Sequence, residues 1–148
     1  MEKLTWVYVE GVFDLFHSGH VNFLKAAREQ GDRLIVALVS DQDVCTYKPA
    51  PIVSFEERKK LVSSCRFVDK LLDAPALIPT TLSHLDFLGA EFVCHGDDMG
   101  SEELTRWYGE LIPAGRLKVV KYSPGISSRE IVSKIAGRLR DGTLRDST

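Results

Sequence analysis

Two histidines, three positions apart, carry the most specific chemical signal in this 148-residue chain. His17 and His20 end the stretch GVFDLFHSGH, which follows a strand-like segment (residues 4–10) and precedes a helix-like one (residues 21–30). A helix start presents free backbone N–H groups and a partial positive charge, so it attracts anions. Imidazoles at positions i and i+3 share one face of the first turn. The pair therefore predicts a site that grips a phosphate group while charge builds on it.

A glycine and an aspartate beside the histidines fit the same chemistry. Gly19 has no Cβ, which lets a phosphate approach the backbone. Asp14 lies three residues before His17, within reach of the same strand–helix turn. The alternative is a helix N-terminus whose two histidines are merely exposed. The long stretch in which the pair is embedded, directly after a strand, favours the phosphate site.

The composition indicates one globular domain. The chain is 44% hydrophobic and 27% charged, which are ordinary fractions for a domain with a sizeable core. We expect the domain to cover residues 1–140, followed by a frayed tail over residues 141–148. A net charge of −2 gives no electrostatic reason to expect nucleic acid or an anionic membrane as a partner. Any phosphate must therefore be held by local groups.

The cysteines and the apolar segments bear on location. Cys45, Cys65 and Cys94 are odd in number, far apart and without a C-x-x-C pair, which argues for reduced thiols and against a structural zinc site. No apolar run is long enough to span a bilayer, and the N-terminus lacks the layout of a signal peptide. We expect a cytoplasmic protein.

Strand-like and helix-like segments alternate along the chain. Ser54 and Glu57, and again Ser127 and Glu130, match capping boxes that begin helices. The expected strands cover residues 4–10, 33–39, 67–72, 90–96 and 117–122, and the expected helices cover residues 21–30, 54–64, 81–88 and 101–111 and begin again at 127. Such alternation predicts an α/β, Rossmann-like fold with a mostly parallel sheet flanked by helices.

The residues with useful chemistry fall at one edge of that sheet. In open parallel sheets, ligands bind beyond the carboxyl ends of the strands, where the strand order reverses. The polar residues that follow the expected strands are Asp14, His17, Asp41, Asp97, Asp98 and Ser127. We therefore expect a single site. A G-x-G-x-x-G fingerprint is absent, which makes dinucleotide oxidoreduction an unlikely function.

Four ordered segments resemble the HxGH cytidylyltransferases, and the phosphoethanolamine branch of that family most of all. They are GVFDLFHSGH, the lysine-bearing YKPAPIVSFEERKKLV, the stretch from CRFVDKLL to CHGDD, and SPGISSREIV, which is similar to an R-T-E-G-I-S-T signature. The similarity runs from about residue 6 to residue 137. It implies a nucleotidyltransferase fold and transfer of CMP from CTP to the phosphate or phosphonate of a small acceptor, with release of pyrophosphate.

The resemblance also implies roles for individual residues. His17 and His20 would donate hydrogen bonds to the α- and β-phosphates, and Lys48 would neutralise charge on the triphosphate. The residues implied in nucleotide binding are Gly11, Phe13, Asp14, Gly19, Arg58, His95, Gly96, Asp97, Gly125, Ile126, Ser127 and Ser128. Those implied in acceptor binding are Asp41, Lys121 and Tyr122. Mg²⁺ is expected to accompany CTP, with Asp14 as its candidate protein ligand, and a homodimer is expected.

Some positions depart from the family pattern. Tyr122 stands where the family has an arginine and Pro124 where it has a glutamate, so Lys121 is the candidate substitute for the missing cation. Glu10 places a charge at the end of a buried strand, where it either contacts a cationic part of the acceptor or faces solvent. The alternatives left open are glycerol 3-phosphate or a small phosphonate as acceptor, an adenylyltransferase of the same fold, and a non-catalytic nucleotide-binding module.

Overall fold

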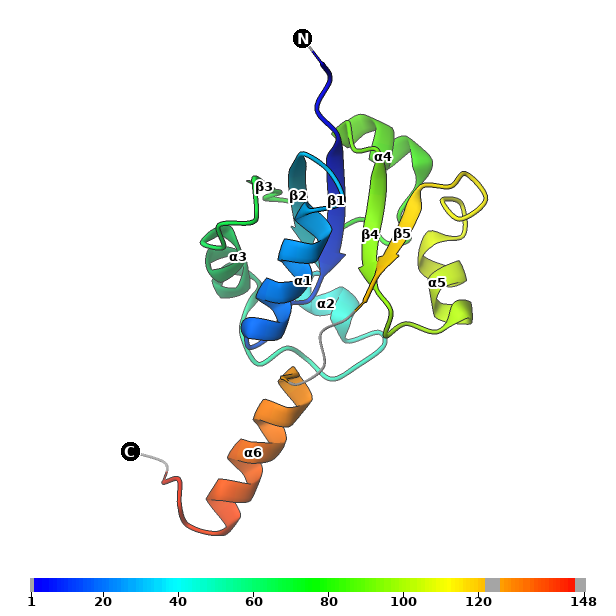
Figure 1. The fold of residues 1–148 in the computed structure, drawn as a ribbon. Helices are drawn as coiled ribbons and strands as arrows, with labels where there is room; N and C mark the ends of the chain where they lie inside the picture. The colour runs from blue at the N-terminus through cyan, green and yellow to red at the C-terminus, as the bar shows by residue number, and fades with distance from the viewer. Residues whose placement is uncertain (1, 122–125, 146–148) are drawn as a thin grey trace.

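Five parallel strands form the centre of the protein (Figure 1). A computed structural model describes residues 2–121 and 126–145. The strands are β1 (Trp6–Gly11), β2 (Arg33–Leu38), β3 (Lys70–Leu71), β4 (Phe92–Gly96) and β5 (Leu117–Val120). Their order in the sheet is β3-β2-β1-β4-β5, and each neighbouring pair is parallel. The predicted Rossmann-like fold is confirmed.

Helices cover both faces of the sheet. They are α1 (Ser18–Arg28), α2 (Asp41–Val44), α3 (Phe55–Ser63), α4 (Leu82–Leu88), α5 (Ser101–Tyr108) and α6 (Ser128–Arg140). Successive strand residues point to opposite faces, so Val7 and Val9 pack with α1 and α3 while Tyr8 packs with α4 and α5. The two apolar layers fix the sheet from both sides and hold its carboxyl edge in place.

The strand order reverses beside β1. From β1 the chain builds outward to β2 and β3, and then returns to add β4 and β5 on the other side. A crevice forms at such a reversal because the connections leave the carboxyl ends of the two central strands in opposite directions. The segments after β1 and β4 are therefore brought to one place.

Most of the predicted elements are present, with two differences. Ser54 and Ser127 cap α3 and α6 as predicted, each side chain accepting a hydrogen bond from the glutamate N–H three residues on. The short helix α2 lies in a segment that we expected to be a loop. Strand β3 is only two residues long because Asp69 accepts the Leu34 N–H at 2.8 Å with its carboxylate, where a ladder would use a backbone carbonyl.

Helix α6 extends away from the sheet and has no buried residue (Figure 1). Its apolar side chains Val132, Ile135 and Leu139 are exposed. A turn follows, in which the Asp141 carboxylate accepts from the backbone N–H and the hydroxyl of Thr143, so the predicted tail begins with a hydrogen-bonded turn. Within residues 2–121 and 126–145, no helix has the length and apolar character needed to cross a membrane.

Candidate functional site

A cavity of about 280 Å³ opens at the carboxyl ends of β1 and β4. Many of the residues that the sequence indicated, from four separate segments, meet there. The predicted residues that line it are Gly11, Phe13, Asp14, His20, Lys48, His95, Gly96 and Ser128. Of the polar residues from which we expect a single site, Asp14 and Asp98 line this cavity, whereas His17, Asp41, Asp97 and Ser127 do not.

A second cavity, of about 180 Å³, adjoins the first and shares Glu10, Lys48, His95 and Asp98 with it. Its remaining walls are largely aromatic and acidic. They include Tyr47, Met99, Glu103, Trp107 and Tyr108. Lys48 thus lies between a pocket beside the histidines and a pocket rich in carboxylates and aromatic rings.

The two histidines form the capping box of α1. Nδ1 of His17 accepts from the Gly19 N–H at 3.0 Å, and Nδ1 of His20 accepts from the His17 N–H at 3.1 Å. Their rings stack with centroids 3.7 Å apart. An imidazole nitrogen that accepts a hydrogen bond carries no proton, so the neutral ring must carry its proton on Nε2. The helix start therefore fixes both rings as Nε2–H donors.

Burial keeps these rings uncharged. It lowers the pKa of His17, and it lowers the pKa of His20 to about 3, with the neighbouring His17 and Lys48 adding to the effect. Nε2 of His17 is buried and has no hydrogen-bond partner among residues 2–121 and 126–145. A buried donor without a partner is costly, so Nε2 of His17 is a candidate donor to a phosphate oxygen.

The backbone between β1 and α1 is strained. Phe13 and Leu15 have φ values of 53° and 50°, in the left-handed region that side chains with a Cβ rarely adopt. The Asp14 carboxylate holds this shape by accepting from the N–H groups of Leu15 (3.0 Å), Ile52 (2.8 Å) and Val53 (2.9 Å). Its carbonyl accepts from the Ser128 hydroxyl at 2.8 Å.

These hydrogen bonds give Asp14 a structural role, whereas we expected it to be a ligand of Mg²⁺. Both of its carboxylate oxygens already accept backbone N–H groups. No cluster of three or more potential metal ligands exists in the described part of the chain. The donor set does not fit a metal site built by the protein.

The structure also gives a different reason for a glycine at position 19 from the one expected. A Cβ at this position would lie 2.7 Å from the Ile126 carbonyl oxygen and 2.9 Å from Cε1 of His17. The chain that enters α6 therefore passes directly over Gly19. This close approach places Ser127 and Ser128, at the start of α6, beside the histidines.

Arg58 and Asp41 do not reach either cavity. Arg58 is 0% exposed, and its guanidinium donates to backbone carbonyls and to the Asp41 carboxylate. The expected contacts of Arg58 with the nucleotide and of Asp41 with the acceptor are thus not supported. A pattern of spacings cannot distinguish an arginine that faces a ligand from one that lies beneath the site.

The remaining predicted residues lie around the cavities or outside the described residues. Ser127 caps α6 by accepting from the Glu130 N–H at 3.1 Å. Asp97, Ile126 and Lys121 do not line the two cavities, and Lys121 and Ile126 are exposed. Tyr122, Pro124 and Gly125 lie outside the described residues.

Glu10 is the main residue that the set of predicted site residues omitted. It is 4% exposed, which excludes the reading in which it faces solvent. Its carboxylate accepts from the hydroxyls of Thr80 at 2.8 Å and Tyr8 at 3.2 Å. Burial raises the pKa of Glu10 to about 7, and the hydroxyls, including that of Tyr108, oppose the rise. The signal in the sequence that could have identified Glu10 as a site residue was its charge within an apolar strand.

The comparisons with known sequences agree on one family. Residues 8–134 match the cytidylyltransferase-like family. The chain is 34% identical over 136 residues to an ethanolamine-phosphate cytidylyltransferase of Dictyostelium discoideum, covering 90% of this chain and 37% of that protein. It is 34% identical over 149 residues to the protein of the same name in Arabidopsis thaliana, covering 98% of this chain and 35% of that protein. The chain thus spans little more than a third of the length of these relatives.

A solved structure supports the fold. The lipopolysaccharide core biosynthesis protein from Thermoplasma volcanium GSS1 superimposes with a TM-score of 0.66 at 24% identity, covering 84% of this chain and all of that one. This likeness concerns the arrangement of strands and helices only.

We predict that Gly19→Ala separates α6 from the histidine motif. The added methyl group overlaps the Ile126 carbonyl, so the backbone must move. The free energy of unfolding should fall by about 1–3 kcal/mol, the usual cost of overpacking, as measured by denaturant titration. Gly100→Ala is the matched control, because a Cβ there meets nothing within 4 Å. An unchanged stability of Gly19→Ala would contradict the close contact.

Proposed function

The chain belongs to the cytidylyltransferase-like family, and on that premise we propose that it transfers CMP from CTP to phosphoethanolamine. An oxygen of the acceptor's phosphate attacks the α-phosphorus of CTP. The bond from that phosphorus to the bridging oxygen breaks, and pyrophosphate leaves. The observation that carries the choice of acceptor is the acidic and aromatic cavity beside Lys48.

Catalysis in this proposal is positioning and charge stabilisation. The attacking oxygen is already anionic, so the reaction needs no strong base. The Nε2–H groups of His17 and His20 are preorganised donors for phosphate oxygens, and they strengthen their bonds as charge develops. Lys48 supplies a positive charge between the two cavities. The start of α6, with Ser128, adds helix-terminal N–H groups and a hydroxyl.

The second cavity fits a cationic head group. The acidic residues Glu10, Asp98 and Glu103 line it, as do the aromatic residues Tyr47 and Trp107, whose ring centroids are 5.1 Å apart. Carboxylates and aromatic faces both attract an ammonium group. An ammonium placed there, with its phosphate at Lys48 and the histidines, has the polarity of phosphoethanolamine. Glycerol 3-phosphate has no ammonium group to match these acidic residues.

We further propose that Mg²⁺ enters with the nucleotide. The carboxylate of Asp14 is engaged by backbone N–H groups, whereas Mg²⁺ usually keeps several waters and binds phosphate oxygens. Calorimetry with Mg²⁺ and the free protein tests this, since tight binding without nucleotide would indicate a protein-held metal.

A homodimer and a cytoplasmic location complete the proposal. The exposed apolar face of α6 (Val132, Ile135, Leu139) would be covered by a second copy. Sedimentation of Ile135→Glu beside the unaltered chain tests this, because a monomer in both would refute it. The unpaired thiols of Cys45, Cys65 and Cys94 are consistent with a reducing compartment, and fractionation of cells tests the location.

Pyrophosphate release tests the reaction itself. We expect turnover with CTP and phosphoethanolamine, and much slower turnover with phosphocholine, glycerol 3-phosphate or a short phosphonate. Use of ATP alone would indicate an adenylyltransferase. CTP binding without turnover on any acceptor would indicate a binding module.

Two substitutions separate the structural and chemical roles of the histidines. His17→Ser and His20→Gln keep the side-chain types that form ordinary capping boxes, so α1 should stay capped. Each removes a phosphate-facing imidazole, and kcat should fall by about 100- to 1000-fold, the usual cost of one preorganised donor. Thermal denaturation should show a stability near that of the unaltered protein. Near-normal turnover in both variants would remove this mechanism.

Glu10→Gln tests the ammonium site. The KM for phosphoethanolamine should rise by at least about tenfold, equivalent to about 1.4 kcal/mol, while the KM for CTP stays nearly constant. Because the pKa of Glu10 is about 7, the carboxyl gains a proton as the pH falls through 7 and loses its attraction for a cation. The KM of the unaltered enzyme for phosphoethanolamine should therefore rise more steeply on acidification than the KM of Glu10→Gln. The variant is the control, because the protonation of the substrate itself affects both enzymes equally.

A further inference from the structure

We infer that Arg58 is a positioning residue for Lys48: from beneath the site, it fixes both ends of the segment that carries this lysine. The segment is residues 45–52, hereafter the lysine segment. The inference deepens the proposed function, since it concerns how one of its catalytic groups is held.

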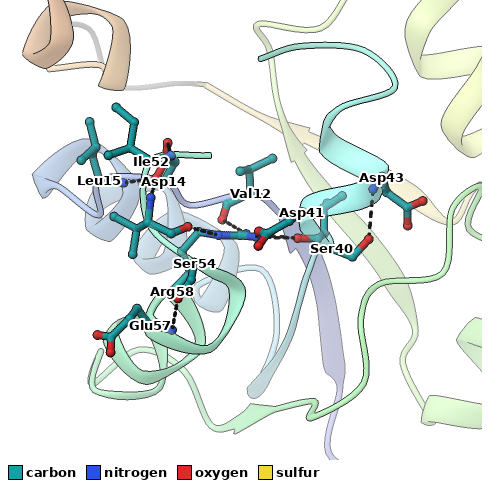
Figure 2. Close-up of polar contacts among 12 residues, drawn as sticks. Val12, Asp14, Leu15, Ser40, Asp41, Asp43, Ile52, Ser54, Glu57 and Arg58 are labelled. Carbon is teal, nitrogen blue, oxygen red and sulfur yellow. Dashed lines mark hydrogen bonds and ion pairs between the residues drawn. The ribbon is translucent and has the colours of Figure 1, made fainter. Parts of the chain in front are cut away.

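The Arg58 guanidinium joins parts of the chain that are distant in sequence (Figure 2). Nη1 donates to the carbonyl of Val12 at 2.7 Å, just after β1. Nη1 and Nη2 donate to the carbonyl of Val39 at 3.1 Å and 3.0 Å, just after β2. Nε donates to the carbonyl of Val53 at 3.0 Å, and Nη2 donates to the Asp41 carboxylate. One buried cation therefore sets the separation of four chain positions.

A short path runs from Arg58 to Lys48. Asp41 is the first residue of α2, and Val44 is its last. The backbone N–H of Lys48 donates to the Val44 carbonyl at 3.0 Å, and that of Tyr47 donates to the same oxygen at 3.1 Å. The ion pair with Arg58 thus holds α2, and α2 holds the backbone of the lysine.

The other end of the lysine segment is tied to the same centre. Val53 accepts from Arg58, while the N–H groups of Ile52 and Val53 donate to Asp14 (Figure 2). Between these anchors, residues 45–50 are exposed. The side chain of Lys48 has the ring of Tyr47 beside it, with its ammonium 5.4 Å from the ring centre. Its position therefore depends on the anchors more than on packing around it.

The burial of Arg58 is expensive, which argues for a positional use. A guanidinium without solvent needs charge and acceptors around it, and an apolar side chain would often give equal or greater stability. Asp41, whose side chain is 48% exposed, is its charged partner. What an apolar side chain cannot do is bind three backbone carbonyls and a carboxylate at once.

A double-mutant cycle tests the inference through kcat. Arg58→Met should lower kcat by at least tenfold in the unaltered background and by less than threefold in Lys48→Ala, because the group that Arg58 positions is then missing. Asp41→Asn should give the same coupling with a smaller loss, because the amide oxygen can still accept a hydrogen bond from Arg58. Val62→Ala is the matched control, since Val62 is a buried residue on α3 outside these hydrogen bonds. Its effect on kcat should be equal in both backgrounds.

Hydrogen exchange gives a readout that does not depend on turnover. At equal loss of thermal stability, Arg58→Met or Asp41→Asn should speed exchange in a peptide covering residues 45–53 at least tenfold, and Val62→Ala should not. Additive kcat losses, or equal exchange in all variants, would overturn the inference. If the unaltered protein turned over no substrate, the proposed function would fail, and the exchange experiment on Asp41→Asn and Val62→Ala would still decide the role of Arg58.

Discussion

The start of α1 is the constraint on which the site depends. A helix leaves its first N–H groups without partners, and here two imidazoles supply the acceptors. Because each Nδ1 is used in this way, each neutral ring is left with one proton, on Nε2. Secondary structure and chemistry are thus set by the same pair of hydrogen bonds. The strained backbone at Phe13 and Leu15 is what brings the chain from β1 into this position.

Charge in this protein is arranged over short distances. The net charge is only −2, yet the two adjoining cavities bring Lys48 together with the acidic residues Glu10, Asp98 and Glu103. Burial lowers the charge that these groups carry, since it keeps the histidines neutral and raises the pKa of Glu10. A small molecule that carries opposite charges at its two ends matches this arrangement, whereas the surface as a whole has no dominant sign.

The sequence predicted the strands, the helices and the general location of the candidate site better than it predicted the roles of single residues. Alternating β-branched runs and two capping boxes were sufficient for the fold, because those signals are local. Arg58 and Gly19 were misread because their environments come largely from segments far away in the chain, namely residues 12 and 39 for the first and residue 126 for the second. Glu10 was ambiguous because burial of a strand end depends on what packs over it, and here Thr80 and Tyr108 do so.

The contact between Ser128 and Asp14 spans 114 positions of sequence. The motif after β1 is thus completed by a segment that follows all five strands in the chain. All five strands precede residue 121, so the sheet has its full set of partners before the start of α6 emerges. A nascent chain of this protein can acquire its scaffold before α6 completes the candidate site, so the order of synthesis makes the assembly of that site follow that of the sheet.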